Sequence, residues 1–261
     1  MNSRNIKKIL VPMMVLFIFL FHVYAGVGSE QASLEKGRKI FEKAIAAMGG
    51  AEKIKKIKNI SYDTDLIRIT SKGEKVTIHS LAVLEYPDKC RYSIDAPRGQ
   101  VIMIVNGDEG WQLFPPNPME PMPEDGIKSQ LATMQKDPLY ISQNLHRYKF
   151  QLVGEKNFAG KKAIALHLTG PTEFNLFIDP NTYLPVGVSY REGILASLNI
   201  AEMEDIFFDY RVVDGIKIPF KYITNGDGKK MAEAVVKELE FNIKTGEDFF
   251  KAKKSPNGKA N

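Results

Sequence analysis

Residues 84–115, LEYPDKCRYSIDAPRGQVIMIVNGDEGWQLFP, indicate most directly how this chain folds. Cys90, Tyr92 and Ile94 alternate with polar residues, and an unbroken apolar run follows at 101–105. Alternation with a period of two is typical of a strand, as is a short apolar run between turn residues. Pro-Asp at 87–88 and Asn-Gly-Asp at 106–108 are turn sequences. The stretch therefore predicts successive antiparallel strands joined by tight turns.

The same alternation extends over most of the chain from Asn59 onward. Turn sequences such as Asp-Pro-Asn at 179–181 and Asp-Gly at 214–215 separate about eleven strands in all. One helix precedes the strands, with Ser33 placed to cap it and Gly-Gly at 49–50 placed to end it. We therefore predict a mainly β (α+β) domain with a single antiparallel sheet and an N-terminal helix.

A different composition interrupts the strands between Trp111 and Phe150. Five prolines lie within residues 115–123, and proline is excluded from the interior of a sheet because it lacks a backbone N–H. Ile127, Leu131 and Met134 then recur at helical spacing, and a second helical pattern covers 138–145. The sequence predicts a proline- and methionine-rich loop and one or two short helices inserted in the middle of the sheet.

The predicted sheet is too wide to stay flat. Eleven strands about 4.8 Å apart span about 50 Å, whereas one helix is only about 10 Å wide. Such a sheet is expected to curl into an incomplete barrel, with the N-terminal helix and the inserted helices partly filling its concave side. Two outcomes stay open on this ground: a hollow that needs an occupant or a movable cover, and a solid core filled by Phe, Tyr and Met side chains.

The N-terminus predicts export. Arg4, Lys7 and Lys8 precede an apolar run at 9–24, and small residues stand before Gly26, which is the pattern of a cleavable signal peptide over residues 1–25. An uncleaved membrane anchor is the alternative, but the run of 16 residues is shorter than the roughly 20 of a spanning helix. We expect a periplasmic protein with one domain over 29–250 and a disordered tail over 251–261.

The charge and the motifs of the sequence narrow the range of possible functions. The signal peptide carries three of the basic residues and no acidic one, so its removal lowers the formal net charge from +5 to +2 and gives no reason to expect nucleic acid as a partner. Cys90 is the only cysteine, so no intramolecular disulfide can form. The chain has no nucleophile elbow, HExxH, phosphate loop or paired-cysteine motif. We therefore expect a protein without enzyme activity, catalytic residues, metal or cofactor.

Residues 84–92, 99–107 and 110–115 together resemble the periplasmic lipoprotein carriers of the Lol type. The shared order is a strand begun by a proline, an apolar strand, a glycine turn, an aromatic strand, and a proline-bearing loop into short helices. Residues 177–185 and 213–220 resemble the wider set of carrier-like exported proteins. The resemblance implies an incomplete antiparallel barrel with the inserted helices as a lid and acyl chains held inside.

Tyr86 departs from that family pattern. The carriers have an arginine at this position, where it latches the lid, and tyrosine offers one hydrogen-bond donor in place of the five of a guanidinium. The departure argues against an arginine latch and leaves open whether lipoprotein is the specific cargo. A lipid or another hydrophobic cargo remains compatible with the sequence.

The leading hypothesis is a soluble periplasmic carrier or chaperone that binds lipid, lipoprotein acyl chains or another hydrophobic cargo in a lidded cavity. Such a carrier could exchange its cargo with an inner-membrane donor and an outer-membrane acceptor protein. The alternative is a periplasmic sensor of the same fold that signals to a membrane partner. Strand alternation and the alignment with the carriers predict that Tyr86, Cys90, Tyr92 and Met103 face the hollow, and Trp111 and Leu113 of the aromatic strand are expected to bind ligand with them. The apolar underside of the lid adds Met119, Met122, Leu131 and Met134.

Overall fold

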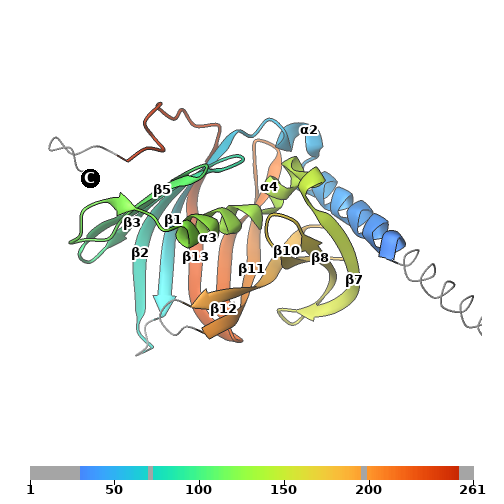
Figure 1. Cartoon of the computed structure of the whole chain (residues 1–261). Helices are drawn as coiled ribbons and strands as arrows, with labels where there is room; N and C mark the ends of the chain where they lie inside the picture. Colours follow the sequence, from blue (N-terminus) through green and yellow to red (C-terminus); the bar gives the residue numbers. More distant parts are fainter. Residues whose placement is uncertain (1–29, 70–72, 195–198, 253–261) are drawn as a thin grey trace, which may run out of the picture.

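Thirteen antiparallel strands form one curled sheet in the computed structural model, which describes residues 30–69, 73–194 and 199–252 (Figure 1). The strands are β1 (Asn59–Ile69), β2 (Lys75–Glu85), β3 (Lys89–Ala96), β4 (Gly99–Asn106), β5 (Glu109–Leu113), β6 (Glu120–Pro121), β7 (Lys149–Phe158), β8 (Lys161–Thr169), β9 (Phe174–Ile178), β10 (Pro185–Ile194), β11 (Asn199–Val213), β12 (Ile216–Gly226) and β13 (Lys229–Phe241). The helices are the N-terminal helix (30–48), α2 (Ala51–Ile54), α3 (Glu124–Gln135), α4 (Pro138–Gln143) and a short 3-10 helix (Leu145–Arg147).

The sheet stays open because its two edges, β6 and β7, do not pair with each other. In space the strands follow the order β6-β5-β4-β3-β2-β1-β13-β12-β11-β10-β9-β8-β7. Strands that are consecutive in the sequence therefore pair, except β6 and β7, and β1 also pairs with β13. The chain between the two edge strands contains α3 and α4, and Figure 1 shows this segment lying across the strands. The inserted helices thus connect the two free edges of an incomplete barrel.

The predicted fold class, with its single curved sheet, N-terminal helix and inserted helical lid, is confirmed. The structure has thirteen strands where the sequence predicts about eleven. One of the additional strands is β6, which has two residues and includes Pro121 from the proline-rich loop. Proline is tolerated at that position because an edge strand has one side on which no N–H donor is needed.

The N-terminal helix packs against β7. The rings of Phe41 and Phe150 stack with their centroids 5.0 Å apart. Ser33 does not cap this helix as predicted, because the helix already includes residue 30. The Ser33 hydroxyl donates instead to the carbonyl oxygen of Leu152, at 3.0 Å, and so ties the helix to the sheet. The helix ends before Gly49 as predicted, and the φ of 133° at this residue favours glycine.

The concave side of the sheet holds the main hydrophobic core. Tyr62, Ala82 and Tyr92 are successive cross-strand neighbours on β1, β2 and β3, and all three contribute to this core. The helical insertion contributes Met134 and Tyr140, which are both fully buried. α3 and α4 therefore pack on the concave face through apolar side chains, as the helical spacing of the insertion predicts.

A second apolar cluster covers part of the convex side. Val83 and Ile104, from β2 and β4, pack against Phe250 of the C-terminal segment. The Arg91 guanidinium donates to the carbonyl oxygen of Phe249 at 3.2 Å and lies 5.5 Å from the centroid of the same residue's ring. The segment that follows β13 is therefore held on the outer face of the sheet, a cover that the sequence analysis did not predict.

Two predictions concern residues outside the described part of the chain. The signal peptide over 1–25 lies entirely outside it, and so does the predicted tail from 253 onward. Ala252, which the sequence analysis places in that tail, instead packs against the convex cluster. Within the described residues, no helix is both long enough and apolar enough to cross a bilayer.

Candidate functional site

A cavity of about 370 Å³ lies on the concave side, between the sheet and the junction of α3 and α4. Strands β1, β2, β11, β12 and β13 supply most of its wall, and residues 136–139 lie on its other side. Most of the lining is apolar or aromatic. The aliphatic side chains that line the cavity include Met48, Leu66, Leu84, Leu139, Ile218 and Val236.

Four tyrosines add hydrogen-bonding groups to this apolar wall. Tyr62, Tyr92, Tyr210 and Tyr222 all line the cavity, and the Tyr210 hydroxyl already donates to the carbonyl oxygen of Pro185. Burial raises the pKa of each well above the ordinary value for tyrosine, so all four remain neutral at physiological pH. The cavity can therefore hold a largely apolar ligand and still offer hydroxyl groups to a polar part of it.

Asp137 places a carboxyl group at the junction of α3 and α4. It is the N-cap of α4, and its carboxylate accepts a hydrogen bond from the backbone N–H of Leu139 at 2.7 Å. Pro138 follows at the first helical position, where a missing N–H costs nothing. Burial raises the pKa of Asp137 to about 6, although hydrogen bonds from Leu139, Tyr140 and the Tyr62 hydroxyl oppose this shift. This carboxyl group therefore titrates near neutral pH.

Three further charged residues line the cavity: Asp205, Lys136 and Lys217, of which Lys217 is exposed. The Asp205 carboxylate on β11 accepts hydrogen bonds from the Tyr190 hydroxyl at 3.1 Å and from Thr224 Oγ1 at 2.6 Å. Lys136, the last residue before Asp137, is 8% exposed, and its Nζ lies 3.7 Å from the centroid of the Tyr190 ring. Buried charges are costly unless they are paired or hydrogen-bonded. The lining of this cavity therefore includes charged groups, which a purely apolar cavity would lack.

Most of the predicted ligand-binding residues contribute to the concave core. Those that do are Tyr86, Cys90, Tyr92, Met103, Met122, Leu131 and Met134. Tyr92 lines the cavity itself, whereas Cys90 and Met134 are fully buried in the surrounding core. Burial raises the pKa of the Cys90 thiol to about 12, so this cysteine carries almost no thiolate at neutral pH. The part of these residues in ligand binding remains a prediction.

Trp111, Leu113 and Met119 lie on the opposite, convex face. Trp111 pairs across strands with Ile104, and Leu113 pairs with Ile102. Cross-strand partners share a face, and these side chains all belong to the convex cluster. The expected orientation of the aromatic strand toward the hollow is therefore off by one residue, and a slip of one residue exchanges the two faces of a strand.

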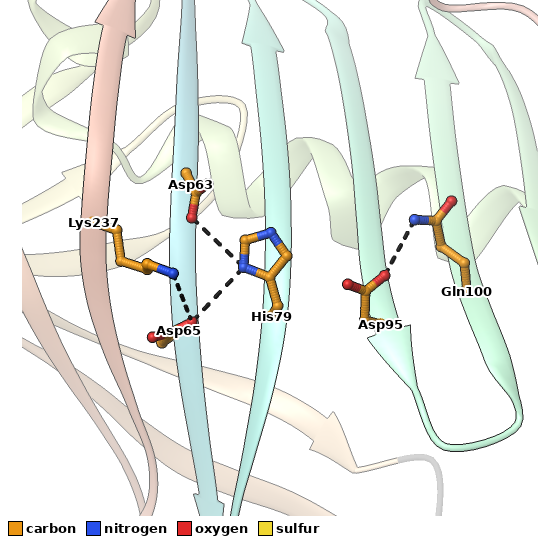
Figure 2. Close-up of polar contacts among 6 residues, drawn as sticks. All are labelled: Asp63, Asp65, His79, Asp95, Gln100 and Lys237. Atoms are coloured by element: carbon orange, nitrogen blue, oxygen red, sulfur yellow. Dashed lines mark hydrogen bonds and ion pairs between the residues drawn. The ribbon is translucent and has the colours of Figure 1, made fainter.

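The convex face also carries a polar cluster on β1, β2 and β13 (Figure 2). His79 Nδ1 lies 3.6 Å from Asp63 Oδ1 and 3.7 Å from Asp65 Oδ1. Lys237 Nζ lies 3.8 Å from Asp65 Oδ1. The two aspartates form the polar strand face that their alternation with Tyr62 predicts, since Tyr62 faces the cavity. In the described ranges, no group of three or more His, Cys, Asp or Glu side chains is arranged to hold a metal ion.

The sequence analysis missed the charged residues of the cavity. Asp137 and Pro138 form a recognisable helix start, with an N-cap residue followed by proline. That signal predicts where a helix begins, but it does not predict that the first residues of the helix are buried, because charged residues at helix ends are usually solvated. Asp205 follows Glu202 and Glu204 in an acidic stretch, which is typical of an exposed strand face. No sequence signal marked Lys136, Asp137 or Asp205 as residues of a cavity.

Comparison with known proteins gives matches among solved structures. No family model matches the chain, and no curated protein matches it. A LolA superfamily protein from Nitrosomonas europaea has a TM-score of 0.56 at 14% identity, over 82% of this chain and 97% of that chain. A putative outer membrane lipoprotein-sorting protein domain from Vibrio parahaemolyticus has a TM-score of 0.55 at 14% identity, over 84% of this chain and 97% of that chain.

A DUF1329 family protein from Desulfovibrio piger is similar to the same degree, with a TM-score of 0.56 at 12% identity, over 82% of this chain and 97% of that chain. At sequence identities this low, the similarity applies to the fold alone. The resemblance read from residues 84–115 is confirmed at that level: the chain has the open, curled β-barrel fold seen in the LolA superfamily structure.

Proposed function

We propose that this protein is a periplasmic carrier that binds the acyl chain of a lipid, or a hydrophobic cargo of similar shape, in the cavity beneath α3 and α4. The observation that carries the proposal is the cavity itself, about 370 Å³ lined mainly by apolar side chains. Small-ligand sites are concave, mostly apolar and roughly 300–1,000 Å³ in volume. Space left empty in a protein core lowers stability, so a ligand that fills it is favoured.

Burial of the acyl chain supplies the affinity, at about 0.8 kcal/mol for each methylene removed from water. Release requires a way to uncover the chain. The two sheet edges, β6 and β7, are joined by α3 and α4 and not by strand pairing. The helices can therefore move away from the concave face while the strand ladder stays intact, and this movement exchanges the cargo.

The N-terminal sequence supports a location outside the cytoplasm. Residues 1–25 have the pattern of a cleavable signal peptide. In the periplasm an acyl chain that passes between two membranes must be shielded from water, and a lidded cavity provides that shielding. An inner-membrane donor and an outer-membrane acceptor are the partners that such a carrier needs.

Adjacent residues of β2 provide a test with a matched control. Ala82 lines the cavity, whereas Leu81 is 40% exposed on the convex face. Ala82→Phe should fill the cavity and weaken binding of a fluorescent fatty-acid probe at least about tenfold, because the ring displaces several methylenes of the ligand. Leu81→Phe introduces the same ring on the other face and should bind the probe like the wild-type protein.

Mass spectrometry of the purified protein provides the second measurement. Wild-type protein and Leu81→Phe should carry bound lipid, and Ala82→Phe should carry much less. Equal probe binding by all three proteins would exclude the cavity as the site. A wild-type protein that binds no probe and carries no lipid would rule out the carrier function, and a stable membrane-protein partner in that case would favour the sensor function.

A further inference from the structure

Lys136 lies where the interior cavity meets a groove on the outside of the molecule. Its side chain lines the cavity and also lines this groove, which runs between α3, residues 171–173 and β10. The residue is 8% exposed. Lysine is seldom buried to this extent unless its charge is paired, because the ammonium group loses its hydration. The groups that surround this ammonium group therefore indicate which kind of ligand the cavity binds.

The ammonium group of Lys136 has no hydrogen-bond acceptor among the described residues. It forms no ion pair or hydrogen bond with any of them. The carboxylates of Glu192 and Asp205 attract it from a greater distance, and its close contact is the ring of Tyr190, whose centroid lies 3.7 Å from Nζ. The face of an aromatic ring attracts a cation but does not replace a hydrogen-bond acceptor. An ammonium group has three N–H donors. The site therefore lacks acceptors for those donors.

The carboxylates of the cavity are already hydrogen-bonded. Asp205 accepts from the Tyr190 hydroxyl and from Thr224 Oγ1, and Asp137 accepts from the backbone N–H of Leu139. These carboxylates therefore already have donors from the protein, whereas the ammonium group of Lys136 has no hydrogen-bond acceptor. The group that the site lacks is an acceptor.

The other cations of the groove are paired. Lys128 Nζ lies 2.6 Å from Glu124 Oε1, and Arg191 Nε lies 3.0 Å from Glu202 Oε1. Lys136 is thus the cation that remains unpaired among the described residues of the groove. Its charge faces the junction where a ligand would pass from the outside into the apolar interior.

We propose that Lys136 binds the anionic head, a carboxylate or a phosphate, of an amphiphile whose chain occupies the cavity. The charged oxygens of the head accept hydrogen bonds from the ammonium group, and such charge-assisted bonds are stronger than neutral ones. The head lies at the junction with the groove and the chain extends along the apolar lining. The inference rests on the proposed carrier function and adds the chemical class of the cargo.

The test compares ligands that share one chain and differ in the head. Dodecanoate, dodecyl phosphate and methyl dodecanoate are each titrated against wild-type protein loaded with N-phenylnaphthylamine, a neutral fluorescent probe, at pH 7.5. Dodecanoate or dodecyl phosphate should displace the probe at a concentration about tenfold or more below that of the ester, which is the range of a hydrogen bond to a charged group. Inorganic phosphate, which has the charge without the chain, should not displace the probe.

Three variants assign the preference to Lys136. Lys136→Met should abolish the preference and leave displacement by the ester unchanged, whereas Lys136→Arg should retain it. Lys237→Met removes one positive charge from the convex face and should behave like the wild-type protein. The proposal would be overturned if the wild-type protein showed no preference for the anionic ligands over the ester, or if that preference survived in Lys136→Met. In either case, displacement of the probe by the ester would still support the carrier function. Failure of every chain to displace the probe would reject the carrier function itself.

Discussion

The convex and concave faces of the sheet bury apolar surface in different ways. On the convex face the chain covers itself, because Phe250 packs onto Val83 and Ile104 and is only 5% exposed. On the concave face α3 and α4 cover the core but leave a cavity of about 370 Å³ that includes Lys136 and Asp137 in its lining. One face is thus filled by the protein's own side chains, and the other has space for a ligand.

The comparison shows that an apolar strand face is not by itself evidence for a binding site. Trp111 and Leu113 are as apolar as Tyr92, yet they pack against the convex cluster while Tyr92 lines the cavity. What distinguishes the concave side is unfilled space together with polar groups that face it. Substitutions on the two faces should therefore differ in kind: convex ones should lower stability, and concave ones should affect ligand binding or the dependence of stability on pH.

The largest effect is expected on the convex face. Phe250→Ala removes a buried ring, and such substitutions typically lower the free energy of unfolding by about 3–5 kcal/mol. Urea denaturation measures the loss, and probe binding under native conditions should stay like that of the wild-type protein. A loss below about 1 kcal/mol would mean that the C-terminal segment does not cover the sheet in solution, and loss of probe binding without loss of stability would contradict the separation of the two faces.

Asp137→Asn should give the next largest effect, through pH. The pKa of this carboxyl group is about 6 in the folded protein and about 3.9 in an unfolded chain, so the folded state binds more protons between these values. Its contribution to the free energy of unfolding therefore falls as pH rises from about 4 to about 6, by about 3 kcal/mol at most, and is level above that range. Asparagine keeps the N-cap and removes the titration.

Urea denaturation across pH 4–7 tests this prediction as a difference between variant and wild type, because other carboxyl groups titrate in the same range. Relative to wild type, the variant should gain stability as pH rises. Asp125→Asn changes an exposed carboxyl group in the first turn of α3 and should show no such gain. If Asp137→Asn parallels the wild-type protein over this range, then Asp137 does not titrate near pH 6.

The smallest effect leaves stability unchanged and concerns thiol reactivity. Cys90 is fully buried, and burial raises its pKa to about 12, so a small polar thiol reagent should label it slowly. Cys90→Ala combined with Leu81→Cys places the thiol on the convex face at an exposed position and should be labelled much faster. Bound lipid should slow labelling of Cys90 alone. Fast labelling of Cys90 that lipid does not affect would contradict its position in the concave core.

The sequence by itself determined the fold class and much of the register. Turn residues and the alternation of Cys90, Tyr92 and Ile94 predict antiparallel strands, because successive side chains of a strand must point to opposite faces. Prolines and helical spacing after Trp111 predict the insertion, because proline cannot donate to a strand ladder. The width of so many strands predicts the curl. Each of these features follows from local backbone geometry, which the sequence encodes over a few residues.

Only the tertiary structure decided which apolar surfaces are filled and which enclose a cavity. Phe250 reaches Val83 from a position far along the chain, and a local pattern cannot show such a contact. Lys136 and Asp137 look like ordinary charged residues at a helix start, and they line the cavity because α3 and α4 connect β6 to β7 across the concave side. Burial depends on packing between distant segments, so a charge that appears solvated in the sequence can be a binding group in the fold.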